Sequence, residues 1–132
     1  MKDFLTDIGA RSAGNATFRT VLETADHCEL VITALKVGED IGMEVHELNQ
    51  FFRVELGSGE AVLDCVTPPI SDGFAVLVSA GTQHNTVNTG TTPLKLYTLY
   101  TPPNHRDGVV HRPVGKCRSP FSTRSGASTP PP

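Results

Sequence analysis

The sequence is poor in several residues and patterns that would point to a common class of protein. It has no tryptophan, two tyrosines and three cysteines among 132 residues. No apolar run reaches the length of about 18 residues that a membrane-spanning helix needs. Basic residues number 11 and acidic residues 14, so the formal net charge is −3 and no basic patch stands out. We therefore expect a protein that binds neither nucleic acid nor a membrane.

The cysteines Cys28, Cys65 and Cys117 are far apart and odd in number. They form no CxxC pair, so their spacing indicates neither a zinc knuckle nor a disulfide framework, and we expect thiols. The first residues of the chain carry acidic side chains where a signal peptide needs an apolar stretch. We therefore expect a cytoplasmic location.

Helical periodicity is nearly absent, and short runs rich in Val, Leu, Phe and Thr recur between Gly, Pro, Asp and Asn. Such runs are typical of β-strands. They predict strands near residues 17–24, 29–36, 41–46, 50–56, 60–66, 73–78, 83–88 and 93–100. Many short strands with close turn signals favour an all-β sandwich or barrel, and 132 residues suit one domain.

Turn residues and composition divide the chain further. Gly57-Ser58-Gly59 predicts a tight hairpin, because glycine tolerates positive φ, and Ser71-Asp72-Gly73 predicts a turn before the next strand. Near the end, Ser, Pro, Thr and Gly dominate, and such a segment buries too little apolar surface to offset its ordering entropy. We expect an N-terminal segment at 1–14, a β-barrel at 15–112 and a flexible tail at 113–132.

Side-chain parity places candidate ligands on one face. Glu44 and His46 are two residues apart in a predicted strand, so they point the same way. If Gln50 faces inward, alternate residues of its strand do so too, and the residues between them face outward. The inward set is Phe52, Val54 and Leu56, and the outward set is Phe51, Arg53 and Glu55. An outward Phe51 is one candidate contact for a second copy of the chain.

Two segments resemble the paired motifs of the cupin superfamily, which read G-x5-H-x-H-x3/4-E-x6-G and G-x5-P-x-G-x2-H-x3-N. In the first segment, Gly57 follows Gln50 after six residues. In the second, the glycines and the last two motif residues fit every spacing, and serine stands where proline is usual. These residues are Gly73, Ser79, Gly81, His84 and Asn88.

The resemblance covers roughly residues 15–112. The stretch 94–103, followed by His105 and Asp107-Gly108, is similar to the end of small single-domain bacterial cupins that are loosely labelled mannose-6-phosphate-isomerase-like. The resemblance implies a double-stranded β-helix, the jelly-roll barrel of this family, and a homodimer.

The resemblance also implies a divalent metal ion held by Glu44, His46, Gln50 and His84. Glu44 stands where the family's first histidine is usual, and Gln50 stands where its glutamate is usual. Two imidazoles and one carboxylate still remain, which resembles the composition of a non-haem iron site. Iron, manganese, nickel and zinc all stay open, because the order of metal affinities does not select among them. Glu44 is also the candidate catalytic base.

The chain has no G-x-S-x-G motif, no phosphate-binding glycine loop and no dinucleotide fingerprint. We therefore expect a metal-dependent enzyme of the isomerase, lyase or dioxygenase type that acts on a small polar metabolite. The alternative is a non-catalytic barrel that binds or senses a sugar-like molecule, and a metal-free structural barrel is a third. His27, His105 and His111 lie outside the motifs, and we expect His105 and His111 at the surface. Tyr97 and Tyr100 are more typical of packing than of a proton donor at the barrel mouth.

Overall fold

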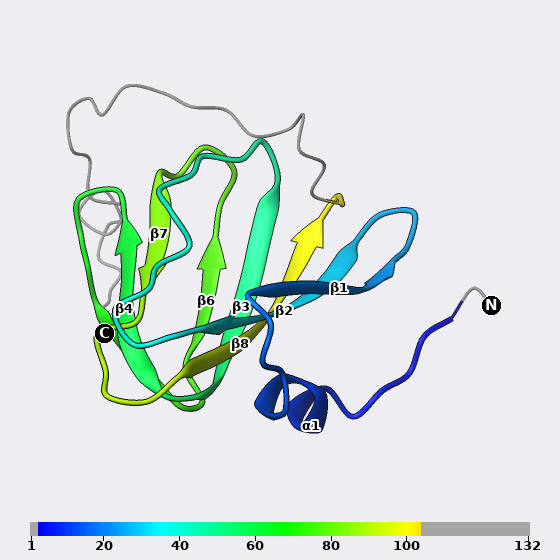
Figure 1. Ribbon diagram of the computed structural model, residues 1–132. Helices are drawn as coiled ribbons and strands as arrows, with labels where there is room; N and C mark the ends of the chain where they lie inside the picture. The colour runs from blue at the N-terminus through cyan, green and yellow to red at the C-terminus, as the bar shows by residue number, and fades with distance from the viewer. Residues whose placement is uncertain (1–2, 104–132) are drawn as a thin grey trace.

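The computed structural model describes residues 3–103 of the chain, which contain one short helix and eight strands joined by turns and loops (Figure 1). The elements are α1 (Ile8–Ala13), β1 (Arg19–Thr24), β2 (Glu29–Leu35), β3 (Asn49–Leu56), β4 (Ser58–Leu63), β5 (Pro69–Ser71), β6 (Ala75–Val78), β7 (His84–Val87) and β8 (Leu94–Thr101). The predicted tail at 113–132 lies outside the described residues, as does the end of the predicted barrel.

The strands form two antiparallel sheets. One has five strands in the order β1-β2-β8-β3-β6, and the other has three in the order β5-β4-β7. The segment 40–46 extends the smaller sheet through single bridges to β7. The sheets share one apolar core, to which the larger sheet contributes Phe52 and Leu96 and the smaller sheet Ala61 and Ile70. The expected all-β barrel is therefore confirmed.

Most predicted strands lie where the sequence placed them, but four details differ. The segment 41–46 forms isolated bridges in place of a strand, whereas β5 and helix α1 were not predicted as elements. The fourth difference is at Gly57, because β3 and β4 belong to different sheets and so do not form the predicted hairpin. The chain crosses between the sheets there, with φ 100° at Gly57.

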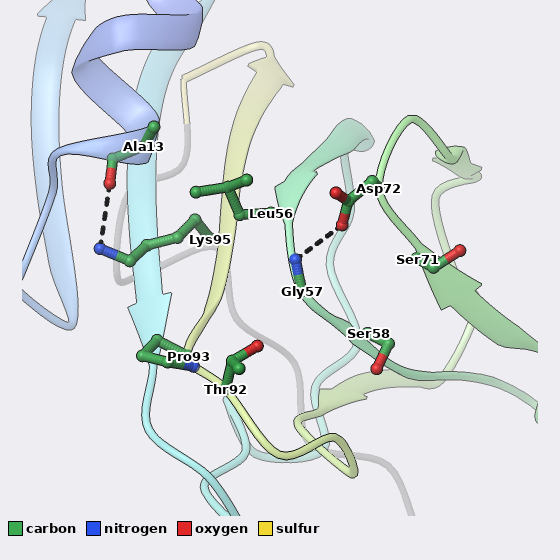
Figure 2. A pocket seen from close by; sticks show the side chains of 9 residues that line it. All are labelled: Ala13, Leu56, Gly57, Ser58, Ser71, Asp72, Thr92, Pro93 and Lys95. Carbon is green, nitrogen blue, oxygen red and sulfur yellow. Dashed lines mark hydrogen bonds between the residues drawn. The ribbon is translucent and has the colours of Figure 1, made fainter.

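The crossing at Gly57 leaves no room for a side chain. A Cβ atom on Gly57 would lie 2.6 Å from the carbonyl oxygen of Pro93, and one on Gly59 would lie 2.2 Å from that of Val87. Figure 2 shows the crossing, where the backbone N–H of Gly57 donates to Asp72 Oδ1 at 2.7 Å. Nearby, Lys95 Nζ donates to the carbonyl oxygen of Ala13 at 3.2 Å and so fixes the end of α1 against β8.

Strand β3 confirms most of the predicted parity. Gln50, Phe52 and Val54 are buried, and Phe51 is half-buried between them. Leu56 is an exception, since 42% of it is exposed. The cause is a register irregularity between Val54 and Leu56 in the pairing of β3 with β8, because an extra residue reverses the face of every residue after it. The homodimer stays a prediction.

The inward face of the larger sheet changes character from one end to the other. At one end, Leu35 lies opposite Leu94 in the pairing of β2 with β8. At the other end, Tyr100 lies between Glu29 of β2 and Gln50 of β3. All five side chains are buried. The fold thus divides its interior into an apolar half, which supplies the core, and a half lined by polar groups.

One expectation from composition is wrong in part. Cys28 is a free thiol, but Cys65 is disulfide-bonded, so the expectation of thiols is wrong for Cys65. Within residues 3–103, no helix is long and apolar enough to cross a membrane.

Asn88 ties three segments together at the apolar end of the barrel. Its side-chain amide donates to the carbonyl oxygens of Leu35 at 3.0 Å and Thr92 at 2.9 Å. Its Oδ1 accepts from the backbone N–H of Gly90 at 2.9 Å, and 1% of the residue is exposed. An asparagine at the end of the second motif therefore has a structural reason: its one amide group forms hydrogen bonds with the end of strand β2 and with the turn before β8.

We predict that Asn88→Ala lowers the free energy of unfolding by about 2–4 kcal/mol, because three hydrogen bonds are lost and buried carbonyls are left without donors. Chemical denaturation measures the change. The control is Asn49→Ala, which removes one exposed hydrogen bond to the N–H of Ala80 and should cost about 1 kcal/mol or less. Equal costs for the two variants would contradict the structural role of Asn88.

Candidate metal centre

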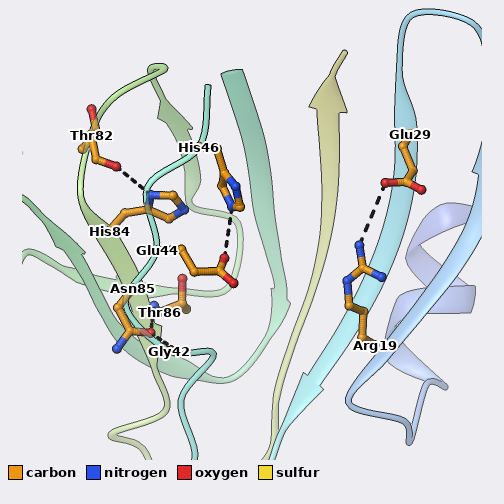
Figure 3. Close-up of polar contacts among 9 residues, drawn as sticks. All are labelled: Arg19, Glu29, Gly42, Glu44, His46, Thr82, His84, Asn85 and Thr86. Carbon is orange, nitrogen blue, oxygen red and sulfur yellow. Dashed lines mark hydrogen bonds and ion pairs between the residues drawn. The ribbon is translucent and has the colours of Figure 1, made fainter. Parts of the chain in front are cut away.

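Three predicted ligands meet at the polar half of the barrel. Glu44 and His46 come from the segment 40–46, and His84 begins β7. One ligand atom from each residue lies within 4.8 Å of the other two (Figure 3). The backbone sets this meeting point, because the N–H of Glu44 donates to the carbonyl oxygen of His84 at 2.8 Å and the reverse bond is 2.9 Å long. Two segments about forty residues apart are thereby held in register.

The three side chains differ in burial. His46 is 2% exposed and His84 is also buried, whereas the side chain of Glu44 is 31% exposed. Glu44 Oε1 lies 3.0 Å from His46 Nε2. The two imidazole rings are 5.1 Å apart between centroids and inclined by 50°. The cluster therefore lies at the boundary between the interior and the solvent, with its carboxylate on the solvent side.

The hydrogen bonds of His84 leave one nitrogen available as a ligand. Its Nδ1 lies 2.9 Å from the carbonyl oxygen of Thr82, and because a carbonyl can only accept, Nδ1 carries the proton. Nε2 then has a lone pair, yet it is buried without a hydrogen-bond partner among the described residues. A backbone carbonyl on one nitrogen and a free second nitrogen is the arrangement typical of a metal-binding histidine.

Gln50 has a related position on the neighbouring strand β3. It is buried, and its Oε1 also has no hydrogen-bond partner within residues 3–103. Gln50 lies opposite Tyr100, whose ring packs edge-on against His46 with 5.9 Å between centroids. An unpaired buried oxygen is costly, and a cation would satisfy it. The clustered donor atoms of Glu44, His46 and His84 thus fit a divalent metal ion, and the buried oxygen of Gln50 is a candidate fourth donor on the neighbouring strand.

Burial and charge shift the pKa values at this site. Burial raises the pKa of Glu44, but the hydrogen bond and the positive potential of His46, with further help from His84 and Arg19, outweigh it and leave the pKa below its usual value. Burial lowers the pKa of His84, although the bond to Thr82 opposes the shift. A carboxylate and a neutral imidazole at neutral pH are the forms that bind a metal.

The two tyrosines lie on opposite faces of the sheet. Tyr100 is buried at the polar half of the interior. Tyr97 is three residues earlier in β8, so its side chain points to the outer face, where it lies opposite Arg53. Burial raises the pKa of Tyr100 to about 12, so its hydroxyl stays protonated. Tyr100 is therefore the tyrosine that reaches the candidate site, in addition to the packing role that we expected.

Two charged residues near the site were missed in the sequence. Glu29 begins β2 on the inward face, and Arg19 begins β1 with its Nη2 atom 3.9 Å from Glu29 Oε1 (Figure 3). Strand parity carried a signal for Glu29. It is separated from Val31, Thr33 and Leu35 by steps of two residues, so its side chain shares their inward face. His27 is exposed. His105 and His111 lie outside the described residues.

Comparison with known protein families agrees with the fold and the motifs. The model of the cupin domain matches residues 31–100, so the chain belongs to the cupin family. The chain is 43% identical over 117 residues to the protein YrkC of Bacillus subtilis, which covers 83% of the chain but 63% of that protein. It is also 32% identical over 131 residues to a protein of Acanthamoeba polyphaga mimivirus, which covers 96% of the chain and 79% of the relative.

Among solved structures, the crystal structure of BH2720 from Bacillus halodurans has a TM-score of 0.76 and 41% sequence identity, over 77% of this chain and 83% of the other. The chain spans less than two thirds of YrkC, so the activity of that whole protein does not transfer directly.

We predict that the stability of the metal-free protein falls as the pH drops below about 6.5. In the unfolded chain, the His84 imidazole takes up a proton at its ordinary pKa of 6.5. In the folded chain its pKa is lower, so protonation there requires a lower pH and acid favours unfolding. The contribution of His84 to the free energy of unfolding is therefore present above pH 6.5 and is lost as the pH falls through the pKa of the folded state.

Denaturation of EDTA-treated protein between pH 5 and 7.5 measures this effect, at a pH above the range in which Glu44 titrates. The slope of the free energy of unfolding against pH should decrease by up to about 1.4 kcal/mol per pH unit in His84→Asn. It should not change in His27→Asn, which alters an exposed histidine. An unchanged slope in His84→Asn would contradict the buried neutral state.

Proposed function

We propose that this cupin is a metal-dependent enzyme that acts on a small polar metabolite by isomerase, lyase or dioxygenase chemistry, with Glu44, His46, Gln50 and His84 as metal ligands. The observation that carries the proposal is the Nε2 atom of His84, which is buried beside the Glu44–His46 pair and has no hydrogen-bond partner within residues 3–103. Thr82 orients the ring and the second nitrogen has no hydrogen-bond partner among the described residues, which is the arrangement expected of a nitrogen that binds a metal ion.

The four ligands supply one negative charge, two neutral imidazoles and one amide oxygen. When bound, a divalent ion would supply Lewis-acid stabilisation of negative charge on a substrate oxygen or, as iron, redox chemistry with dioxygen. The usual cupin set also has one carboxylate, but here it stands at the first motif position in place of the third. Gln50 then supplies a neutral oxygen where the family usually has a charged one.

The chain's own groups suit proton transfer. Glu44 is ionised at neutral pH because its pKa is lowered, and 31% of its side chain is exposed, so it could accept a proton from a substrate if it detached from the metal. Tyr100, with its pKa raised to about 12, keeps its proton and can donate a hydrogen bond to negative charge that develops on a substrate oxygen. One acceptor and one donor around the same His46 ring are the minimum that enolisation or isomerisation requires.

We predict that His84→Ala abolishes metal binding and any turnover. Elemental analysis of untagged protein should find close to one ion per chain in the wild type and at most about a tenth of that in the variant, because a principal ligand is removed. The control is His27→Ala, which removes an exposed histidine and should keep the full metal content. A wild-type protein that holds no metal after incubation with Fe, Mn, Ni and Zn would refute the proposal.

We predict opposite effects for the two positions at which the ligand set departs from the family. Glu44→Gln removes the only carboxylate and should weaken metal binding about tenfold or more, whereas Gln50→Glu adds a second carboxylate and should hold or tighten it. Competition with a fluorescent chelator measures both affinities. The control is Glu55→Gln on the outer face, paired with Arg53 at 2.8 Å, which should have no effect. Weaker binding in Gln50→Glu would exclude Gln50 as a ligand.

The altered ligand positions also favour a second candidate function, a barrel that binds or senses a sugar-like molecule without converting it. Replacing Glu at the third motif position by Gln50 removes a group that can exchange protons. Thermal stabilisation of the metal-loaded protein by a panel of small polar metabolites identifies ligands in either case. Stabilisation without any product detected by mass spectrometry would favour the sensor, and product formation would favour the enzyme.

A further inference from the structure

Arg19 brings a positive charge to the polar half of the barrel. It begins β1 and lies opposite Thr33, a buried residue of β2. Its Nη2 atom lies 3.9 Å from Glu29 Oε1, and Figure 3 shows the guanidinium directed toward that carboxylate. A guanidinium is charged at every physiological pH. The site therefore contains a permanent cation besides any metal ion.

Arg19 is coupled to the groups of the metal centre through Tyr100. Tyr100 lies opposite Glu29, the partner of Arg19, in the pairing of β2 with β8. Burial raises the pKa of Tyr100, and the positive charge of Arg19 opposes that rise. The same Tyr100 ring packs edge-on against His46 at 5.9 Å, and His46 Nε2 lies 3.0 Å from Glu44. Arg19 also lowers the pKa of Glu44 by its charge. The charge of Arg19 therefore acts on both Tyr100 and Glu44, the two groups on either side of His46.

The contact between Arg19 and Glu29 is long for an ion pair. The outer-face pair of Arg53 and Glu55 is 2.8 Å apart, whereas the pair of Arg19 and Glu29 is 3.9 Å apart. The Arg19 side chain is 39% exposed, and that of Glu29 is 11% exposed. Glu29 therefore orients Arg19 from the buried side, and the exposed part of the guanidinium fork can face a ligand. A fork of this kind matches the oxygens of a carboxylate or phosphate.

We propose that Arg19 and Tyr100 form an anion-binding subsite, so that the substrate is a small metabolite with a carboxylate or phosphate at the end remote from the metal. The inference rests on the proposed function, because the metal holds the other end. It also separates the two candidate functions chemically, since a neutral sugar would offer the exposed part of the Arg19 guanidinium no anionic group, and Glu29 would remain its acidic partner.

The test uses three molecules that share a 2-hydroxycarboxylate for the metal and differ at the far carbon. Glycerate has a neutral hydroxyl there, L-malate a carboxylate and 3-phosphoglycerate a phosphate. Calorimetric titration of the manganese-loaded wild type should give affinities for at least one of the two charged-end molecules about tenfold or more above that for glycerate. Which of the two binds more tightly distinguishes a carboxylate from a phosphate.

The variants Arg19→Met and Arg19→Gln, compared with the wild type at equal metal content, should reduce this preference to about threefold or less by weakening the charged-end molecules more than glycerate. The matched control is Arg53→Met, which removes the same charge from the outer face and should keep the preference. Two arginine variants are used so that poor folding of one does not decide the result.

Two failures can be told apart. A wild type with full metal content and no preference for the charged ends overturns the subsite and leaves the metal centre intact, and so does a preference that survives in the Arg19 variants. A wild type that holds no metal overturns the proposed function and this inference with it.

Discussion

The pair of backbone hydrogen bonds between Glu44 and His84 is the constraint on which the site depends. The bonds are 2.8 and 2.9 Å long and form an isolated bridge outside any regular strand pair. They align two segments that are distant in the sequence, so the side chains of Glu44 and His84 leave the sheet side by side. A slip of one residue would turn one of them away from the interior, because parity reverses with each residue.

The barrel divides its interior between stability and chemistry. Leucine and valine side chains fill one end of the inward face, and Glu29, Tyr100 and Gln50 form a row across the other. Burial of apolar surface supplies the favourable free energy of folding. The polar end carries costs in return, since His84 Nε2 and Gln50 Oε1 are buried without partners among the described residues. The apolar end therefore stabilises a site that by itself opposes folding.

The exchange of ligand types in the first motif moves the negative charge of the proposed centre. Glu44 is partly exposed, whereas Gln50 is buried. A carboxylate at the exposed position can keep its charge at lower cost, because solvent compensates it better there. The buried position then has a neutral amide, which is less costly to desolvate. This distribution of charge follows the burial of the two positions.

Much of the fold could be predicted from the sequence, because strand period and turn residues are local signals. The paired motif spacing brought Glu44, His46 and His84 together correctly, and the parity of β3 placed Gln50 inside. The predicted hairpin at Gly57 was wrong, because a glycine with positive φ suits a tight turn and a crossing between two sheets equally well. The choice depends on which strands pair, and that is a long-range property.

The sequence by itself determined the strands, the family and the residue types of the candidate site, since each depends on local pattern or on motif spacing. Only the tertiary structure decided that Tyr100, and not Tyr97, reaches the interior, and that Arg19 and Glu29 lie near it. The reason is physical: the order of strands in a sheet brings distant residues together, and the burial that shifts their pKa values arises only when both sheets have closed around them.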